Sequence, residues 1–346
     1  PIQALQEGGE EITKGAPPPL EEPYPGCGDF VKLAFTRKGI PGDTIDIMTA
    51  SLSKNTLKQY NSTFSKWWGF CRGEIETILQ PNAQKILSFL KTEFDKGAQY
   101  STLNTHRSAL NLICDGGNSE IVVRFMKGIF KLRPQFPKYQ ETWDPQPVLA
   151  YLSSLYPLDK LNLELSTIRM VLLLALCSAQ RAQTFSKIRL SNIKISEVGI
   201  EIRSSDILKT SGPKKPQPVL RFHFFKENPE HCICSTLMHY IEKTKVFRGN
   251  EDFLILTIKK PHKPATSQTI SRWIKKGLRN AGIDPKFKGH STRHSSSSAA
   301  LRAGTSIESI RKAAGWSEKS ETFNRFYNKP LSTEELYFAD YIKKYV

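Results

Sequence analysis

Apolar residues recur every three to four positions along several short segments in the first third of the chain. One such segment begins at Ser53, a residue type that suits a helix N-cap. The next begins at Asn82, another residue that caps helices. Two further segments with the same period follow at residues 101–114 and 120–134. The pattern predicts a compact helical domain, which we assign to residues 45–135.

A proline-rich stretch at residues 136–147 interrupts this periodicity and predicts a linker between two domains. The second predicted domain, residues 148–330, mixes helical periods with two short alternating segments joined by a basic hairpin tip. The expected helices lie near 146–155, 162–178, 232–245, 267–282, 291–303 and 306–314, and the expected strands at 199–208 and 218–225. The fold class is therefore mainly α with one small antiparallel β-sheet.

Both ends of the chain differ from the two predicted domains. Residues 1–44 are rich in Pro, Gly and Glu and show little periodicity, so we expect a disordered or loosely attached tail. Residues 331–346 begin with a capping-box pattern at Ser332 and Glu335, followed by some apolar surface. This pattern predicts a C-terminal helix.

Composition adds a candidate partner. Hydrophobic residues make up 39% of the 346 residues, enough for two cores, and the formal net charge is +17. Such a positive charge favours a polyanion, above all a nucleic acid, although a generically basic protein has the same composition. The longest apolar run, residues 170–177, lies between Arg169 and Arg181 and is too short to span a bilayer. We expect it to be a buried core helix, and we expect no membrane association.

The 6 cysteines are scattered along the chain, which argues against a disulfide framework and for a reducing compartment. His231, Cys232 and Cys234 form the only dense thiol cluster. A structural zinc site needs four ligands at recognisable spacings, and no second pair accompanies this cluster. We therefore expect buried core cysteines and no metal site, with zinc as the alternative.

Several residues with catalytic chemistry follow one another in the second predicted domain. Arg181 ends the apolar helix, and the basic hairpin "KTSGPKKPQ" begins with Lys209. The motif "HSTR" at 290–293 starts a predicted helix, whose N-terminus favours an anion. Downstream, Trp316 follows a glycine turn, and Tyr327 comes eleven residues after Trp316.

This ordered set resembles the active site of tyrosine recombinases: an Arg, a hairpin Lys, H-x-x-R, a His or Trp after a Gly, and then a Tyr. The resemblance covers about residues 45–346. The details "KTSGPKK", "HSTRHS" and "AAGWSEKSETFNRFYNKP" are most similar to recombinases of eukaryotic mobile elements, such as DIRS-like and Ngaro-like retrotransposons and Cryptons. The resemblance implies a two-domain architecture in which a helical, SAM-like core-binding domain and an α+β catalytic domain form a C-shaped clamp on DNA.

The chemistry of strand cleavage suits these residue types. Tyr327 can attack phosphorus and keep the bond energy as a phosphotyrosine, while His290 removes or returns its proton. The guanidinium groups of Arg181 and Arg293 match phosphate geometry and stabilise the transition-state charge. Trp316 can donate its indole N–H to the phosphate and wall off the site.

Some assignments within the set leave alternatives. Lys209 is the expected general acid for the departing 5′-oxygen, with Lys214 and Lys215 on the same hairpin as alternatives. His294, directly after the second arginine, is expected to support the site and not to act in acid–base chemistry. Three other tyrosines compete with Tyr327 as the nucleophile: Tyr337, Tyr341 and Tyr345.

The resemblance implies a site-specific recombinase or integrase that needs no cofactor and no metal and binds no small-molecule ligand. Its partners would be double-stranded DNA and further copies of itself, as a dimer on each site and a tetramer in synapsis. The C-terminal helix at 331–346 would then be exchanged between protomers, and the location would be the nucleus. Two other functions remain open: a domesticated, inactive DNA-binding protein, and a strand-resealing enzyme like a type IB topoisomerase.

Overall fold

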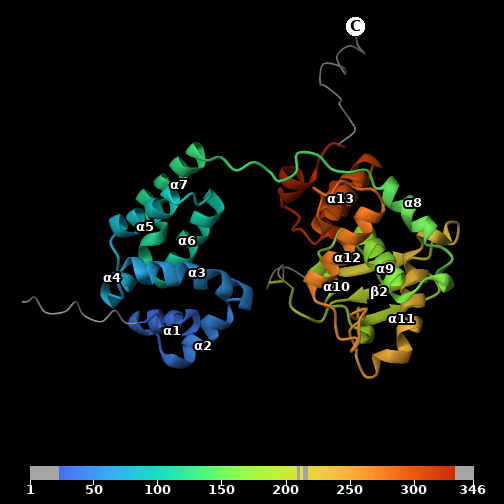
Figure 1. Ribbon diagram of the computed structural model, residues 1–346, viewed down its shortest axis with the longest axis horizontal. Coiled ribbons are helices and arrows are strands. Elements are labelled where there is room, and N and C mark those ends of the chain that lie inside the picture. The colour runs from blue at the N-terminus through green and yellow to red at the C-terminus, as the bar shows by residue number, and fades with distance from the viewer. Residues whose placement is uncertain (1–22, 209–210, 213–216, 332–346) are drawn as a thin grey trace, which may run out of the picture. The chain divides into compact units, whose positions relative to one another are not determined.

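The computed structural model describes residues 23–208, 211–212 and 217–331 (Figure 1). The chain divides into two compact units, the first ending at Phe136 and the second beginning at Pro137. Across the described ranges, no helix has both the length and the apolar character needed to cross a membrane.

Unit 1 is built of helices packed around one aromatic core. Within the described residues they are α1 (Cys27–Arg37), α2 (Gly42–Ala50), α3 (Lys54–Phe70), α4 (Ile75–Leu79), α5 (Ala83–Asp95), α6 (Tyr100–Ile113) and α7 (Glu120–Leu132), with the 3₁₀ turn η1 (Asp115–Asn118) between α6 and α7. The predicted caps are confirmed. The Ser53 side chain accepts the backbone N–H of Thr56 at 3.1 Å, and Asn82 accepts that of Lys85 at 2.8 Å.

Two of these helices correct the expected N-terminal tail. Helix α1 and the first residues of α2 lie within residues 1–44, which we expected to be disordered or loosely attached. Phe30 of α1 is fully buried, and its ring meets the rings of Phe64 at 5.2 Å and Trp68 at 5.5 Å. The Pro- and Gly-rich composition hid this short amphipathic helix, which gains its stability from the tertiary contact.

Unit 2 combines helices with one small sheet. Its described helices are α8 (Gln146–Ser154), α9 (Leu163–Ser178), α10 (Ala182–Phe185), α11 (Ile233–Arg248), α12 (Ser267–Asn280), α13 (Thr292–Arg302) and α14 (Ile307–Ala314). Short turns of 3₁₀ helix add η2 (Leu158–Lys160), η3 (Leu190–Asn192), η4 (Pro229–His231) and η5 (Gly289–Ser291), and a π-helical turn forms η6 (Phe323–Tyr327). The six helices expected in this domain are all present, with ends that differ by a few residues.

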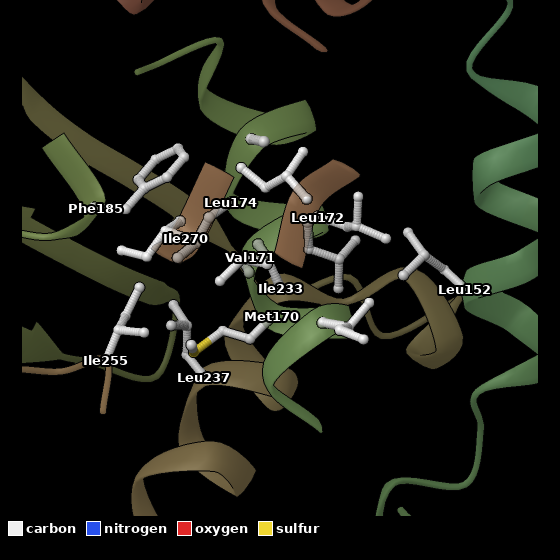
Figure 2. Close-up of a cluster of buried hydrophobic side chains, with 14 of the residues drawn as sticks. Leu152, Met170, Val171, Leu172, Leu174, Phe185, Ile233, Leu237, Ile255 and Ile270 are labelled. Atoms are coloured by element: carbon white, nitrogen blue, oxygen red, sulfur yellow. The ribbon is translucent and has the colours of Figure 1, made fainter. Parts of the chain in front are cut away.

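Helix α9 forms the centre of unit 2 and contacts α11, α12 and α13. It is apolar on all sides, as the sequence predicted for a buried helix, and Figure 2 shows Met170, Val171 and Leu174 among side chains from neighbouring elements. Arg169 on the same helix is also fully buried. Its guanidinium donates to the carbonyl oxygens of Leu152, Leu155 and Glu230 and to the Thr236 hydroxyl. This arginine therefore fixes the end of α8 and the turn η4 against the central helix.

The described strands form an antiparallel sheet in the order β1 (Ile193–Ile195), β2 (Gly199–Arg203) and β3 (Val219–His223). Ile200 pairs with Phe222 and Ile202 with Leu220, so one face is apolar and buried. The fold class, mainly α with a small antiparallel sheet, is confirmed. Strand β2 ends earlier than expected, at Arg203, where its pairing with β3 ends.

The proline-rich stretch is not a free linker along its whole length. Tyr139 and Trp143 are buried in the core of unit 2, and Trp143 donates its indole N–H to the Ser291 hydroxyl at 2.9 Å. The backbone N–H of Thr142 donates to the carbonyl oxygen of Pro330 at 2.8 Å. The prolines signalled irregular backbone, but the aromatic side chains between them supply packing surface.

Candidate active site

Arg181 lies where the central helix ends. The last residue before this turn, Ala179, takes a left-handed backbone conformation with φ 50°, which costs energy for a residue with a Cβ. Arg181 then occupies the N-cap position of α10 with a half-buried side chain. No hydrogen bond holds its guanidinium within the described part of the chain, so its donors are available to a ligand.

Arg181 lines a cavity of about 420 Å³ in unit 2. The walls come from the start of α10, one face of α12 and the turn η5. The described lining residues are Gln180, Arg181, Ala182, Gln183, Ser267, Gln268, Ser271, Arg272, Ile274, Lys275, Lys288, Gly289, His290 and Thr292. Several of them are cationic and none is acidic, so the cavity favours an anion of phosphate size.

The pKa of Lys275, which lines the cavity, is lowered by neighbouring positive charges. The positive charge of Arg279, partial loss of hydration and the charge of Lys288 together lower the pKa of Lys275. The close approach of η5 to α12 depends on Gly289, because a Cβ there would lie 2.9 Å from the carbonyl oxygen of Ser271. The glycine before His290 thus lets the histidine reach the cavity wall.

Tyr327 contacts His290, one of the residues that line this cavity. The His290 Nε2 and the Tyr327 hydroxyl lie 3.0 Å apart, within the same chain. Tyr327 is the last residue of the π-helical turn η6 and is buried. The Ser298 hydroxyl on α13 donates to the backbone carbonyl of Tyr327 at 2.6 Å and accepts the N–H of Lys329 at 3.1 Å. Helix α13 therefore fixes the backbone on which the tyrosine is carried.

Arg293, on the first turn of α13, joins the ends of two other helices. Its terminal nitrogens donate to the carbonyl oxygens of Ala179, after α9, and Ala314, at the end of α14, both at 2.7 Å. The guanidinium carbon lies 4.3 Å from the ring centroid of Trp316 and 5.3 Å from that of Tyr327. Arg293 has no exposed surface.

Trp316 lies where the sequence predicted it, directly after a glycine turn. Gly315 has φ 68° and closes α14 in the left-handed conformation that suits glycine. The Trp316 and Tyr327 ring centroids are 4.8 Å apart. Two buried donors here, Trp316 Nε1 and Arg293 Nε, have no hydrogen-bond partner among the described residues. Unpaired buried donors are costly, and an incoming anion would satisfy them.

The predicted residues therefore form two adjoining groups. Arg181 and His290 line the open cavity, whereas Arg293, Trp316 and Tyr327 form a buried cluster that is absent from the described cavity wall. The hydrogen bond between His290 and Tyr327 joins the two groups. A phosphate in the cavity would meet Arg181 first, because Arg293 is fully buried and does not line the cavity.

The charge states follow from this environment. Loss of hydration, with the positive charges of Arg293 and Arg181, lowers the pKa of His290 to about 4, although the residue is exposed at the surface. His290 is thus the neutral base at pH 7. Burial and the charge of Arg181 lower the pKa of Arg293 to about 10, so Arg293 remains a cation at pH 7.

Several predicted residues lie outside the described part of the chain: Lys209, Lys214, Lys215, Tyr337, Tyr341, Tyr345 and the segment 332–346. The choice of general acid and the C-terminal helix therefore stay predictions. The base of the hairpin is described, and Ser211 donates its hydroxyl to the Gln217 side chain at 2.9 Å.

Other cavity residues were missed by sequence reasoning. Arg272 and Lys275 project from α12, where the polar face of a strongly amphipathic helix was the available signal, and Lys288 precedes the H-x-x-R motif. Cys232 and Cys234 are free thiols buried in the core. Among the described residues, no group of His, Cys, Asp or Glu side chains is arranged to hold a metal ion.

Comparison with known proteins agrees with this geometry. The phage integrase family matches residues 157–332, and the N-terminal SAM-like domain of phage integrases matches residues 47–112. No curated protein matches the chain.

Solved structures share the fold at low sequence identity. A XerH site-specific recombinase bound to its difH substrate is 13% identical, with a TM-score of 0.59 over 87% of this chain and 90% of that one. The Tn1549 transposon integrase, in complex with circular intermediate DNA, is 12% identical, with a TM-score of 0.56 over 93% and 99%. A lambda integrase dimer bound to a core site is 16% identical, with a TM-score of 0.51 over 86% and 96%. The family match spans half of this chain and contains the whole described site, and the chain therefore belongs to the phage integrase family of tyrosine recombinases.

Proposed function

We propose that this protein is a site-specific DNA recombinase that cleaves and rejoins DNA strands through a 3′-phosphotyrosyl intermediate on Tyr327. The observation that carries the proposal is the 3.0 Å contact between the Tyr327 hydroxyl and His290 beside a cavity lined by cations. A nucleophile, a neutral base and an anion site are thereby within reach of one another, as phosphoryl transfer requires.

The residues of the site can move each proton that cleavage requires. His290 Nε2 accepts the phenolic proton of Tyr327 as the phenolic oxygen attacks phosphorus, and the bond from phosphorus to the 5′-oxygen breaks. The departing 5′-oxygen needs a proton, and the hairpin lysine, Lys209 by resemblance, is the proposed donor. Arg181, Arg293 and the indole N–H of Trp316 would stabilise the negative charge on the non-bridging oxygens.

Rejoining reverses these roles. A 5′-hydroxyl from the partner duplex passes its proton to the hairpin lysine, now neutral, as its oxygen attacks the phosphotyrosine. The bond from phosphorus to the phenolic oxygen breaks, and His290 returns the proton to Tyr327. We propose that no metal takes part, since the described cavity lining offers arginine and lysine for charge neutralisation and no carboxylate ligand. Cleavage that persists in the presence of EDTA would support this point.

The biological setting of the proposal rests on resemblance. The motifs "HSTRHS" and "AAGWSEKSETFNRFYNKP" support integration or excision of a eukaryotic mobile element, and hence a nuclear location. We further propose that the two units clamp duplex DNA, that protomers act as a dimer on each site and a tetramer in synapsis, and that the segment after 331 is exchanged between them. The DNA-bound XerH, Tn1549 and lambda integrase structures support binding to DNA.

Covalent trapping tests the function. The probe is a pool of duplexes with a randomised central sequence and a nick, so that the short cleaved strand diffuses away and the covalent complex accumulates. We expect complexes that resist denaturant with the wild type and none with Tyr327→Phe, because only the hydroxyl is lost. The matched control Tyr337→Phe should trap normally.

Each other outcome has a definite meaning. Covalent trapping by the Tyr327→Phe variant would indicate that another tyrosine is the nucleophile. Tight DNA binding by the wild type without any covalent product would contradict an enzyme and favour an inactive DNA-binding protein. Resealing of the original strand alone, without exchange between duplexes, would indicate the topoisomerase-like reaction.

A further inference from the structure

His294 contacts the Tyr327 ring directly and has no assigned chemical step. Its ring stacks on the Tyr327 ring with the centroids 4.4 Å apart and the planes 24° from parallel. His290, by contrast, meets the same ring edge-on and contacts the hydroxyl. The two histidines thus act on different parts of the tyrosine.

The position of His294 is itself fixed by its surroundings. It lies on α13, is only 9% exposed, and is contacted edge-on by Tyr139 at a centroid distance of 5.5 Å. Tyr139 is held in turn by the backbone N–H of Lys288, which donates to its hydroxyl at 3.2 Å. His294 therefore presents a rigid aromatic surface against which Tyr327 rests.

A second contact of His294 is polar. The backbone of Phe326, the residue next to Tyr327 in η6, acts on the imidazole and opposes the lowering of the His294 pKa by burial. The ring nitrogen Nδ1 is buried and has no partner among the described residues. It therefore contacts no described group to which it could pass a proton, and it does not line the described cavity.

We propose that His294 is a positioning residue, which holds the Tyr327 ring by stacking so that the hydroxyl stays at His290 beside the cavity. A tyrosine ring that rotates about its side-chain bonds moves its oxygen by several ångströms, and misplacement of about 1 Å can cost 10²-fold in rate. The proposal rests on the assignment of Tyr327 as the nucleophile, but the stacking contact itself can be tested without DNA.

Two substitutions separate the contacts of His294. His294→Phe keeps a flat ring of similar size and removes both ring nitrogens, whereas His294→Gln keeps a polar side chain and removes the ring. If stacking positions the tyrosine, trapping at saturating nicked duplex should stay within about threefold of wild type for the Phe variant and fall by about 10²-fold for the Gln variant. DNA affinity should change little in both, because the residue acts on the bound complex.

A control comes from another histidine in contact with an aromatic ring. His262 lies against Phe247 with the centroids 4.2 Å apart and the planes 33° from parallel, outside the cluster around Tyr327. His262→Gln should leave the trapping rate unchanged, which would show that the loss of a ring-packed histidine elsewhere does not mimic the effect. Equal loss in the Phe and Gln variants of His294, or the reverse order, would overturn the proposal, as would full activity of the Gln variant.

A second readout does not depend on DNA cleavage. Acetylation of Tyr327 by N-acetylimidazole, followed by mass spectrometry of its peptide, reports how freely the hydroxyl moves into solvent. We expect a several-fold faster reaction in His294→Gln and an unchanged rate in His294→Phe. An unchanged rate in both would contradict the positioning role even if the wild type failed to cleave DNA, so failure of this inference and failure of the proposed function are distinguishable.

Discussion

Arg293 has no surface exposed to solvent, and its terminal nitrogens hold the carbonyl oxygens of Ala179 and Ala314. Arg181 lines the open cavity and has no hydrogen bond within the described residues. Both guanidinium groups carry a positive charge toward the same site, yet one is also part of the framework. The difference arises because Arg293 must compensate for its own desolvation with buried hydrogen bonds.

This difference predicts that the two arginines contribute unequally to stability. Arg293→Ala should lower the free energy of unfolding by about 3–5 kcal/mol, because two buried carbonyl oxygens lose their donors along with the cation. Arg181→Ala should change it by less than about 1 kcal/mol but lower the trapping rate by about 10²–10³-fold. Urea unfolding and covalent trapping measure the two quantities. Equal destabilisation by both substitutions would contradict the framework role of Arg293.

At the scale of elements, the sequence predicts helices best where the hydrophobic period and the N-cap residue indicate the same start. Ser53 and Asn82 cap α3 and α5 as expected, and the apolar run at residues 170–177 identified α9 as a buried core helix. Helices α1 and α2 were missed because their short apolar faces lie among Gly and Pro residues. Such a helix is marginal alone and depends on packing against a core that the local sequence does not reveal.

The contact of α1 with the unit 1 core predicts a large effect at Phe30. Phe30→Ala should destabilise unit 1 by about 3–5 kcal/mol, because it leaves a cavity beside Phe64 and Trp68. Ile47→Ala on α2 is the matched control, since its side chain is exposed and its replacement should cost less than about 0.5 kcal/mol. Chemical denaturation of the full chain measures both effects. Unchanged stability of the Phe30→Ala variant would mean that α1 is only loosely attached to unit 1.

At the scale of the whole molecule, the net charge of +17 predicts strong, salt-dependent binding to DNA of any sequence. If the cavity faces the DNA backbone, Lys275→Ala and Lys288→Ala should each reduce the slope of log affinity against log salt concentration by about 1. Lys245→Ala on α11 is the control, because this exposed lysine lies near Glu242 and outside the described cavity wall. Fluorescence anisotropy with a random-sequence duplex gives the slopes. Unchanged slopes for both cavity variants would mean that these lysines contact no phosphate.

The sequence by itself determined the fold class, the course of the central helix and the order of Arg181, His290, Arg293, Trp316 and Tyr327 along the chain. These features are local, since periodicity, capping and motif spacing are set by neighbouring residues. Only the tertiary structure decided which groups meet. It buried Arg293 beneath two aromatic rings, placed the Tyr327 hydroxyl at His290, stacked His294 on the tyrosine and packed Tyr139 behind it. Those contacts join residues far apart in the chain, and long-range packing determines them.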